Sequence, residues 1–201
     1  MKRLQSNDTG KAKLFEQKGL NCLTKTPVWL SIIVYTLIWA ALIIAHKIFG
    51  SASALSSVLI YLFAMGFWTF FEYMAHRFLF HWVNDNPKVQ RFHYLIHGVH
   101  HDYPRDEERL IMPIVPGFIL VCVLTAIFII PFGSNTFIWM AGFINGWAIY
   151  VSIHYMVHAY QPIQSLKILW THHAKHHYKA GDKAFGVSSP FWDKVFGTMP
   201  D

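Results

Sequence analysis

Four long apolar runs limit the folds open to this chain more than any other feature of its sequence. They occupy residues 27–50, 54–76, 110–131 and 136–160 of the 201 residues. Each run approaches or exceeds the roughly 20 residues with which a helix spans the hydrocarbon of a bilayer. Helices of soluble proteins are usually shorter, and four of this length would dominate so small a chain. The runs therefore predict an all-α integral membrane protein. We place its four transmembrane helices at about 28–48, 54–75, 111–131 and 136–158.

The positive charges indicate how these helices are oriented. Of the 17 Lys and Arg residues, six precede the first run, five lie between the second and third, and five follow the fourth. The connections 50–53 and 132–135 carry no charge. The positive-inside rule therefore predicts a multi-pass protein with both termini in the cytoplasm, capped there by residues 76–109 and 160–201. The net charge of +6 fits contact with anionic lipids and needs no nucleic acid to explain it.

The first run differs from a cleaved signal peptide. A polar-rich stretch of 26 residues precedes it and no small-residue cleavage site follows it. We therefore expect residues 1–26 to form a cytosolic N-terminal segment. Cys22 on the cytosolic side and Cys122 inside the third run cannot pair in this topology, so no disulfide framework is expected.

Histidine is the second unusual feature. Twelve of the 13 histidines fall in four short windows, which the predicted topology brings to one membrane face. Two windows contain the spacing H-x-x-H-H, at 97–101 and 173–177. The other two hold the pairs His76/His81 and His154/His158, at the cytosolic ends of the second and fourth runs.

Helical spacing makes each H-x-x-H-H motif a candidate metal clamp, because residues i, i+3 and i+4 lie on one helix face. His76 and His81 are five residues apart, so we expect the helix to deform or end there and turn both side chains inward. The two motifs and two pairs predict a centre of two metal ions, with each motif acting as one clamp. The ten candidate ligands are His76, His81, His97, His100, His101, His154, His158, His173, His176 and His177.

Each element has a plainer interpretation when taken alone. A single i, i+4 histidine pair is more often a satisfied interfacial pair than a metal site. The convergence of four windows from separate segments favours a metal centre. Imidazole ligands suit Zn, Fe, Cu and Ni, and the spacing does not choose among them. Two metals beside apolar helices suggest redox oxygen chemistry on a lipid.

Glu72 lies one helical turn before His76, at the cytosolic end of the second run. An ionisable side chain at membrane depth is a functional candidate. We expect its carboxylate to accept a ring N–H from a ligand histidine and so to fix the tautomer of that ring. The alternative is an interfacial carboxylate that reaches toward water.

Four segments of the sequence resemble a known family. They are "HRFLFH" (76–81), "HYLIHGVHHDYPRDEERLIMP" (93–113), "HYMVH" (154–158) and "THHAKHHYKAGDKAFGVSSPFWDKVFGT" (171–198). Together they resemble the fatty acid hydroxylase superfamily of membrane di-metal oxygenases, which includes sterol desaturases and carotenoid hydroxylases. The segments "HGVHHDYPRD" and "FGVSS-x-x-WD-x-VFGT" are most similar to the fatty acid 2-hydroxylase branch. The resemblance runs from about residue 25 to the C-terminus, and it implies a hydroxylase domain over 27–201.

The resemblance assigns the ten candidate ligands to the metal-binding positions of the family. It leaves out His93 and His172, which we expect to support the ligands. It also implies two iron ions as cofactors, with O₂ as co-substrate, although zinc could occupy the same imidazoles. The implied reaction is hydroxylation at C2 of a long-chain fatty acyl group in lipid or sphingolipid biosynthesis.

The sequence departs from the family pattern in two places. Eukaryotic 2-hydroxylases often carry an N-terminal cytochrome b5 domain, for which the first 26 residues are too short and lack a histidine. We therefore expect a separate electron donor, a cytochrome b5-like or ferredoxin-like protein, which the basic cytosolic face could dock. The second departure is Met112-Pro113-Ile114, where the family has a double proline.

Two alternative functions follow from the same features. A sterol or carotenoid hydroxylase or desaturase would share the metal ligands and differ in its cavity. A metal transporter or sensor would need polar ligands near the bilayer midplane, whereas these histidines gather at one end of the helices. For the acyl substrate, we expect Tyr103, Arg109, Tyr178 and Trp192 to line the site, with ordinary interfacial packing as the alternative role of each.

Overall fold

The computed structural model describes residues 10–201, and all of its regular elements are helices. Residues 1–9, the first part of the predicted N-terminal segment, lie outside the described residues. Four long helices make up the body: α2 (Val28–Phe49), α3 (Ala54–Ala75), α6 (Ile114–Phe132) and α7 (Thr136–Ala159). Their bounds agree with the predicted apolar helices to within about three residues.

Local sequence explains where the long helices begin and end. Pro27 and Pro113 precede the first residues of α2 and α6, and the Ser53 side chain accepts a hydrogen bond from the Ser56 N–H at the start of α3. Gly133 has a φ of 52° directly after α6 and begins the 3₁₀ turn η4 (Gly133–Asn135). Glycine adopts this conformation at little cost, so the chain can reverse into α7.

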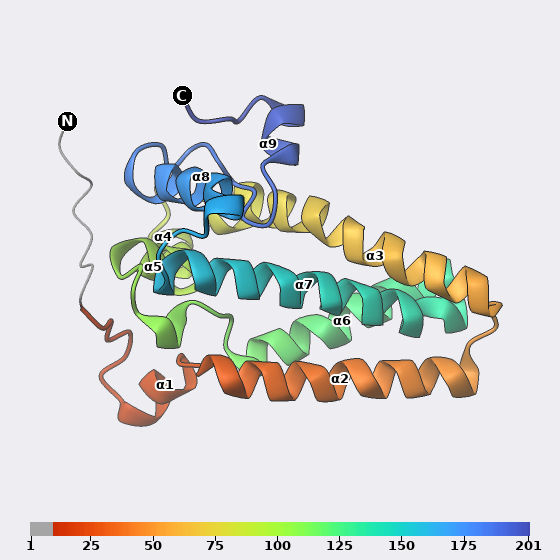
Figure 1. The fold of residues 1–201 in the computed structure, drawn as a ribbon. Coiled ribbons are helices and arrows are strands. Elements are labelled where there is room, and N and C mark those ends of the chain that lie inside the picture. The colour runs from red at the N-terminus through yellow and green to blue at the C-terminus, as the bar shows by residue number, and fades with distance from the viewer. Residues whose placement is uncertain (1–9) are drawn as a thin grey trace.

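Helix α7 is the central element of the body. It packs against α3, α2 and α6, as Figure 1 shows, and most of its first ten residues are buried. The contact with α3 is close: a Cβ added at Gly142 would lie 2.2 Å from the Tyr61 carbonyl oxygen. Trp68 of α3 packs with Trp139 and Phe143 of α7 in one buried cluster.

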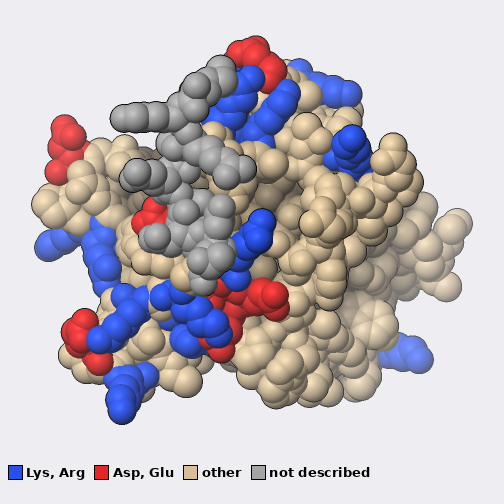
Figure 2. Space-filling view, turned by 60° about the vertical axis from the view of Figure 1, so that its left-hand side comes forward, with Lys and Arg blue, Asp and Glu red and all other residues tan. Residues whose placement is uncertain are grey.

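Among the described residues, three helical stretches are long and apolar enough to cross a membrane: Val28–Phe49, Ala54–Phe80 and Glu107–Ala159. The third stretch contains both α6 and α7, so four separate spans remain a prediction. Figure 2 shows charged side chains gathered at the end of the molecule that carries the short helices, beside a broad uncharged surface. This division fits a membrane-embedded body with a polar end.

The short elements form a cap at that end (Figure 1). They are α4 (Pro87–His93), α5 (Val99–Asp102), α8 (Lys167–Tyr178), α9 (Phe191–Phe196), the π-helices η1 (His76–Phe80) and η2 (Tyr94–Gly98), and the 3₁₀ turns η3 (Glu107–Arg109) and η5 (Gln164–Leu166). The N-terminal segment, including α1 (Lys18–Leu23), packs here too, with Ala12 and Leu14 against Val99. That the cap lies in the cytoplasm remains a prediction.

Candidate metal centre

The ten predicted ligands come together in two groups of five, and within each group the ligand nitrogens all lie within 4.8 Å of one another. We call them group A and group B. Group A consists of His76, His81, His97, His101 and His176. Group B consists of His100, His154, His158, His173 and His177. The prediction that these ten side chains converge is confirmed in geometry, and their binding of metal remains a prediction.

The prediction that each H-x-x-H-H motif clamps one metal is wrong. His97 and His101 belong to group A and His100 to group B, whereas His173 and His177 belong to group B and His176 to group A. In an α-helix, residue i+4 lies about 40° from residue i, and residue i+3 lies about 60° away on the opposite side. Each motif therefore supplies two neighbouring side chains to one group and its third to the other.

The expected deformation between His76 and His81 is confirmed. Residues His76–Phe80 form a π-helix at the end of α3, and the His81 N–H donates to the His76 carbonyl at 3.2 Å. In this geometry residues i and i+5 lie close together, which brings both histidines into group A. A second π-helix, Tyr94–Gly98, contains His97 and had no signal in the sequence.

Backbone carbonyls hold three of the ligand rings. The Nδ1 atoms of His76, His154 and His176 lie 2.5, 3.2 and 2.7 Å from the carbonyl oxygens of Phe185, Leu110 and Lys183. An Nδ1–H that donates to a carbonyl leaves the lone pair on Nε2. In these three rings the Nε2 lone pair therefore faces the middle of the group.

Burial keeps the rings neutral. For the ligands outside the long helices, burial, together with the charges of neighbouring histidines, lowers the pKa of His81 to about 3 and that of His101 to about 2. Burial also lowers the pKa of His176 to about 4, and holds the pKa values of His97 and His173 well below their usual range. All of these rings are uncharged at neutral pH, which is the form that binds metal.

The spacing of the ring nitrogens fits a metal ion. Nε2 of His76 lies 3.0 Å from Nε2 of His97, and Nε2 of His158 lies 2.8 Å from Nε2 of His173. Two neutral nitrogens whose lone pairs face one another at this distance need a cation or a proton between them. Ligands at right angles on a metal with bonds of about 2.1 Å are themselves about 3 Å apart. The two groups therefore have the donors and the spacing for one metal each.

Glu72 binds the backbone of the C-terminal segment rather than a histidine ring. Its Oε1 accepts hydrogen bonds from the N–H groups of Val187 and Ser188 at 2.6 and 2.9 Å, and the Ser188 hydroxyl donates to its other oxygen. The expected hydrogen bond from a ligand ring is absent among the described contacts of this carboxylate. The carboxylate is nevertheless buried, at 4% exposure, and lies four residues before His76.

An apolar cavity of about 500 Å³ reaches the centre from the helical body. His76 and His97 of group A and His100 and His154 of group B line one part of it. Side chains of α2, α3, α6 and α7 line much of the rest, among them Tyr35, Trp68, Leu124, Met140 and Phe143, and side chains of the N-terminal segment and the cap complete the lining. These residues were not predicted, because apolar side chains that line a cavity have the same spacing as those that fill a core.

A second, smaller cavity of about 270 Å³ lies on the cap side of group B, and His158, His173 and His177 line it.

Of the four side chains expected near the substrate, Arg109 lines the apolar cavity and Tyr178 the smaller one. The Arg109 guanidinium donates to Asp106 at 2.7 Å. Tyr103 and Trp192 line neither cavity: Tyr103 packs near Val99 and Trp192 against Phe70. Their substrate contacts remain predictions.

The two cap histidines outside the ligand set are placed differently. His172 is buried, and its Nε2 lies 3.0 Å from Asp193 Oδ2. His93 is partly buried beside the His81 ring, at 6.2 Å between centroids. Neither belongs to group A or group B.

Comparison with known proteins identifies the family. The family model described as "Fatty acid hydroxylase" matches residues 61–198, which include all ten group A and group B histidines. The chain belongs to the fatty acid hydroxylase family. It is therefore a hydroxylating oxidoreductase, and the resemblance seen in its sequence is confirmed.

Several relatives of this hydroxylase are similar over most of its length. It is 32% identical over 197 residues to the dihydroceramide fatty acyl 2-hydroxylase FAH2 of Arabidopsis thaliana, covering 94% of this chain and 80% of the relative. It is 38% identical to the ceramide very long chain fatty acid hydroxylase scs7 of Schizosaccharomyces pombe, covering 94% of this chain and 55% of the relative. Human fatty acid 2-hydroxylase is 36% identical, over 69% of this chain and 39% of the relative.

A solved structure has the same fold. It is described as full-length scs7p with only the hydroxylase domain visible, and it superposes with a TM-score of 0.86 at 31% identity. The match covers 96% of this chain and 74% of that structure. The hydroxylase described here thus corresponds to only part of the longer relatives.

Proposed function

We propose that this hydroxylase is a membrane-bound non-haem di-iron oxygenase that hydroxylates a long-chain fatty acyl group at C2. The observation that carries the proposal is the apolar cavity, because histidines of both groups line one part of it and mostly apolar side chains of the long helices and the cap line the rest. An acyl tail fits such a cavity, and its first carbons would then lie beside the ring nitrogens. The names of the plant, yeast and human relatives support this reaction.

The residues of the centre have defined tasks in this proposal. Group A and group B would each hold one iron ion, and zinc could occupy the same imidazoles. The bound ions would supply the activation of O₂, which the protein cannot perform with its side chains alone. Burial keeps the ligand rings neutral, and the apolar walls of the cavity exclude water and hold the acyl tail.

The proposed membrane topology places the centre at the cytosolic face. Residues 27–201 would form the hydroxylase domain, with four spans, and both termini would lie in the cytoplasm. An electron donor must then reach the cap from the cytosol, and Figure 2 shows Lys and Arg side chains exposed at that end. A cytochrome b5-like or ferredoxin-like protein with an acidic surface would suit this face.

Lipid analysis with a labelled substrate tests the reaction. Cells that lack 2-hydroxylated lipids would express the protein and receive a long-chain fatty acid carrying two deuterium atoms at C2. We expect acyl chains that have gained one oxygen and lost one deuterium, as mass spectrometry detects. A His97→Ala variant, expressed and inserted to the same level, should give no such product.

The outcomes of that experiment distinguish the candidate reactions. Acyl chains that gain oxygen but keep both deuterium atoms would contradict attack at C2. Unchanged acyl chains together with altered sterols or carotenoids would show that the protein acts on the other substrates of this superfamily. No lipid change, with metal carried across the membrane instead, would indicate a transporter.

A further inference from the structure

Two buried carboxylates hold four consecutive backbone N–H groups of the C-terminal segment. Asp193 accepts from Phe185 and Gly186, at 2.9 Å to Oδ1 and 2.8 Å to Oδ2. Glu72 accepts from the next two residues, at 2.6 and 2.9 Å. Asp193 lies on α9 and Glu72 on α3, so residues 185–188 are fixed from two sides.

The same stretch presents its carbonyls to group A. The Phe185 carbonyl accepts from His76 Nδ1 and the Lys183 carbonyl from His176 Nδ1. Ala184 between them is fully buried and has a φ of 60°, in the left-handed region that a residue with a Cβ rarely adopts. Such strain persists only where the surrounding structure imposes it, and it is common at functional sites.

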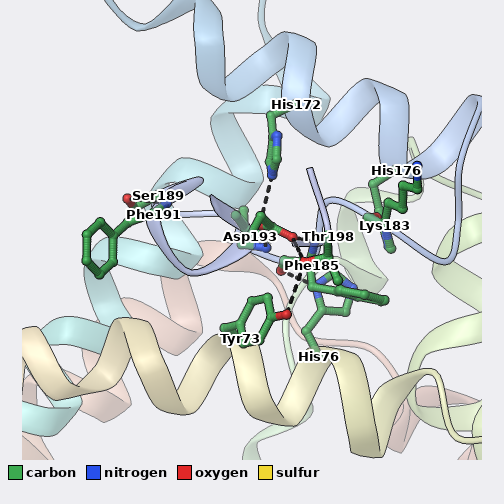
Figure 3. Close-up of polar contacts among 12 residues, drawn as sticks. Tyr73, His76, His172, His176, Lys183, Phe185, Ser189, Phe191, Asp193 and Thr198 are labelled. Atoms are coloured by element: carbon green, nitrogen blue, oxygen red, sulfur yellow. Dashed lines mark hydrogen bonds and ion pairs between the residues drawn. The ribbon is translucent and has the colours of Figure 1, made fainter. Parts of the chain in front are cut away.

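Asp193 is the point at which these contacts meet (Figure 3). Besides the two N–H groups, its carboxylate accepts from the Thr198 hydroxyl at 2.7 Å and from His172 Nε2 at 3.0 Å. Its side chain is fully buried. Burial acts to raise the pKa of Asp193, but the hydrogen bonds from His172, Thr198 and the backbone outweigh it and hold the pKa below its usual value.

We propose that Asp193 is a positioning residue for the group A metal. It holds residues 185 and 186 directly, and so fixes the short stretch whose Lys183 and Phe185 carbonyls orient the His176 and His76 rings. The inference rests on the proposed function only in requiring a metal at group A. Group B depends on this segment much less. Within residues 10–201, the carbonyl contact found for group B comes from Leu110, and the Nδ1 atoms of His100, His173 and His177 have no hydrogen-bond partner.

Asp193→Asn tests this role with little change in side-chain size, because an amide has one oxygen acceptor where a carboxylate has two. Both carboxylate oxygens accept from backbone N–H groups, so either orientation of the Asn amide places an NH₂ against an N–H donor. The segment must then move. Loss of a hydrogen-bonding partner that orients a ligand weakens metal binding by about 10- to 100-fold. Only group A should show this loss.

Metal counting tests the proposal. Purified wild-type and variant proteins would be dialysed against increasing chelator, and the iron and zinc retained per chain would be measured. We expect Asp193→Asn to release one of its two metals at about 10- to 100-fold lower chelator concentration than the wild type. Adding His158→Ala, in group B, should remove the remaining metal, whereas adding His81→Ala, in group A, should remove no more.

Two further variants make the result decisive. Asp106→Asn is the control, because it alters an equally buried carboxylate that accepts hydrogen bonds from Arg109 and the Ala12 N–H. The Asp106→Asn protein should retain both metals. Thr198→Val removes the hydrogen bond to Asp193 together with the 3.0 Å contact between the Thr198 and Tyr73 hydroxyls. It should weaken binding of the same metal to a smaller extent, which decides the case if Asp193→Asn does not fold.

Two results would overturn the proposal: retention of both metals in the folded Asp193→Asn or Thr198→Val protein, or the parallel loss of both. Wild-type protein without two metals would instead contradict the proposed function.

Discussion

His100 and His176 are the residues that connect the two halves of the centre. Each is the i+3 member of its H-x-x-H-H motif. The ring of His100 lies in group B and that of His176 in group A, whereas their motif partners lie in the other group. Each cap motif therefore contributes side chains to both groups. Neither group is complete until α8 has packed against the 97–101 segment.

This exchange predicts an unusual pattern in double variants. His100→Ala combined with His173→Ala removes two ligands of group B, so one of the two metals should remain bound. His97→Ala combined with His100→Ala damages both groups, although both residues lie in one motif, so neither metal should remain tightly bound. Metal analysis of the two purified double variants checks the pattern. Equal metal contents would contradict the assignment of these residues to groups A and B.

Glu72 offers a second test at the scale of single residues. Glu72→Ala leaves the N–H groups of Val187 and Ser188 without their acceptor, and each buried unpaired group costs about 1–3 kcal/mol. Glu72→Gln should cost much less, because one amide oxygen can accept both bonds as Oε1 does now. Thermal unfolding in detergent measures the difference. Equal losses in the two variants would show that the charge, rather than the hydrogen bonds, is needed.

The residue types of the site could be predicted from the sequence, and their grouping could not. Histidine spacing identified all ten members of groups A and B. Which group receives an i+3 side chain depends on the helix packed against it, and the sequence does not record that. The partners of the rings were missed for a similar reason, since the carbonyls of Leu110, Lys183 and Phe185 carry no signature of residue type.

At the scale of elements, the α3–α7 contact supports the centre from the membrane side. Helix α3 leads directly to His76, and α7 carries His154 and His158. The small residues Gly142 and Gly146 let α7 approach the α3 backbone, since an added Cβ would lie 2.2 Å from the Tyr61 carbonyl or 2.5 Å from the Trp68 Cβ. A change in the distance between α3 and α7 should therefore displace histidines of both group A and group B.

Gly142→Ala should therefore separate the two helices. We expect a loss of about 1–3 kcal/mol in the free energy of unfolding, as for other overpacked cores, together with weaker retention of both metals. Gly66→Ala is the matched control, because an added Cβ meets no atom within 4 Å there. Thermal unfolding of both variants measures the effect. A Gly142→Ala protein as stable as the Gly66→Ala protein would contradict the close packing of α3 and α7.

The element boundaries followed from the sequence because apolar runs and their Pro, Ser and Gly ends act locally. The π-helix after α3 also left a signal, in the five-residue spacing of His76 and His81. The second π-helix, Tyr94–Gly98, left none, since its single ligand His97 has no partner at i+5 within it.

At the scale of the whole molecule, the native cysteines can test the predicted topology. Cys22 is exposed and precedes α2, whereas Cys122 lies within α6. A membrane-impermeant maleimide should label Cys22 in inside-out vesicles and not in intact cells, and a Cys22→Ser variant should lose that labelling. Labelling of Cys22 from outside intact cells would reverse the predicted orientation.

We propose that each of the two histidine groups binds one metal ion, and the metal content of the purified wild-type protein measures this. Elemental analysis against protein concentration, after removal of loosely bound ions, gives the number of metals per chain. Two groups of five neutral imidazoles predict two tightly bound ions, with iron in the active enzyme. A single tightly bound ion per chain, or none in a folded and membrane-inserted protein, would contradict the assignment of one metal to each group.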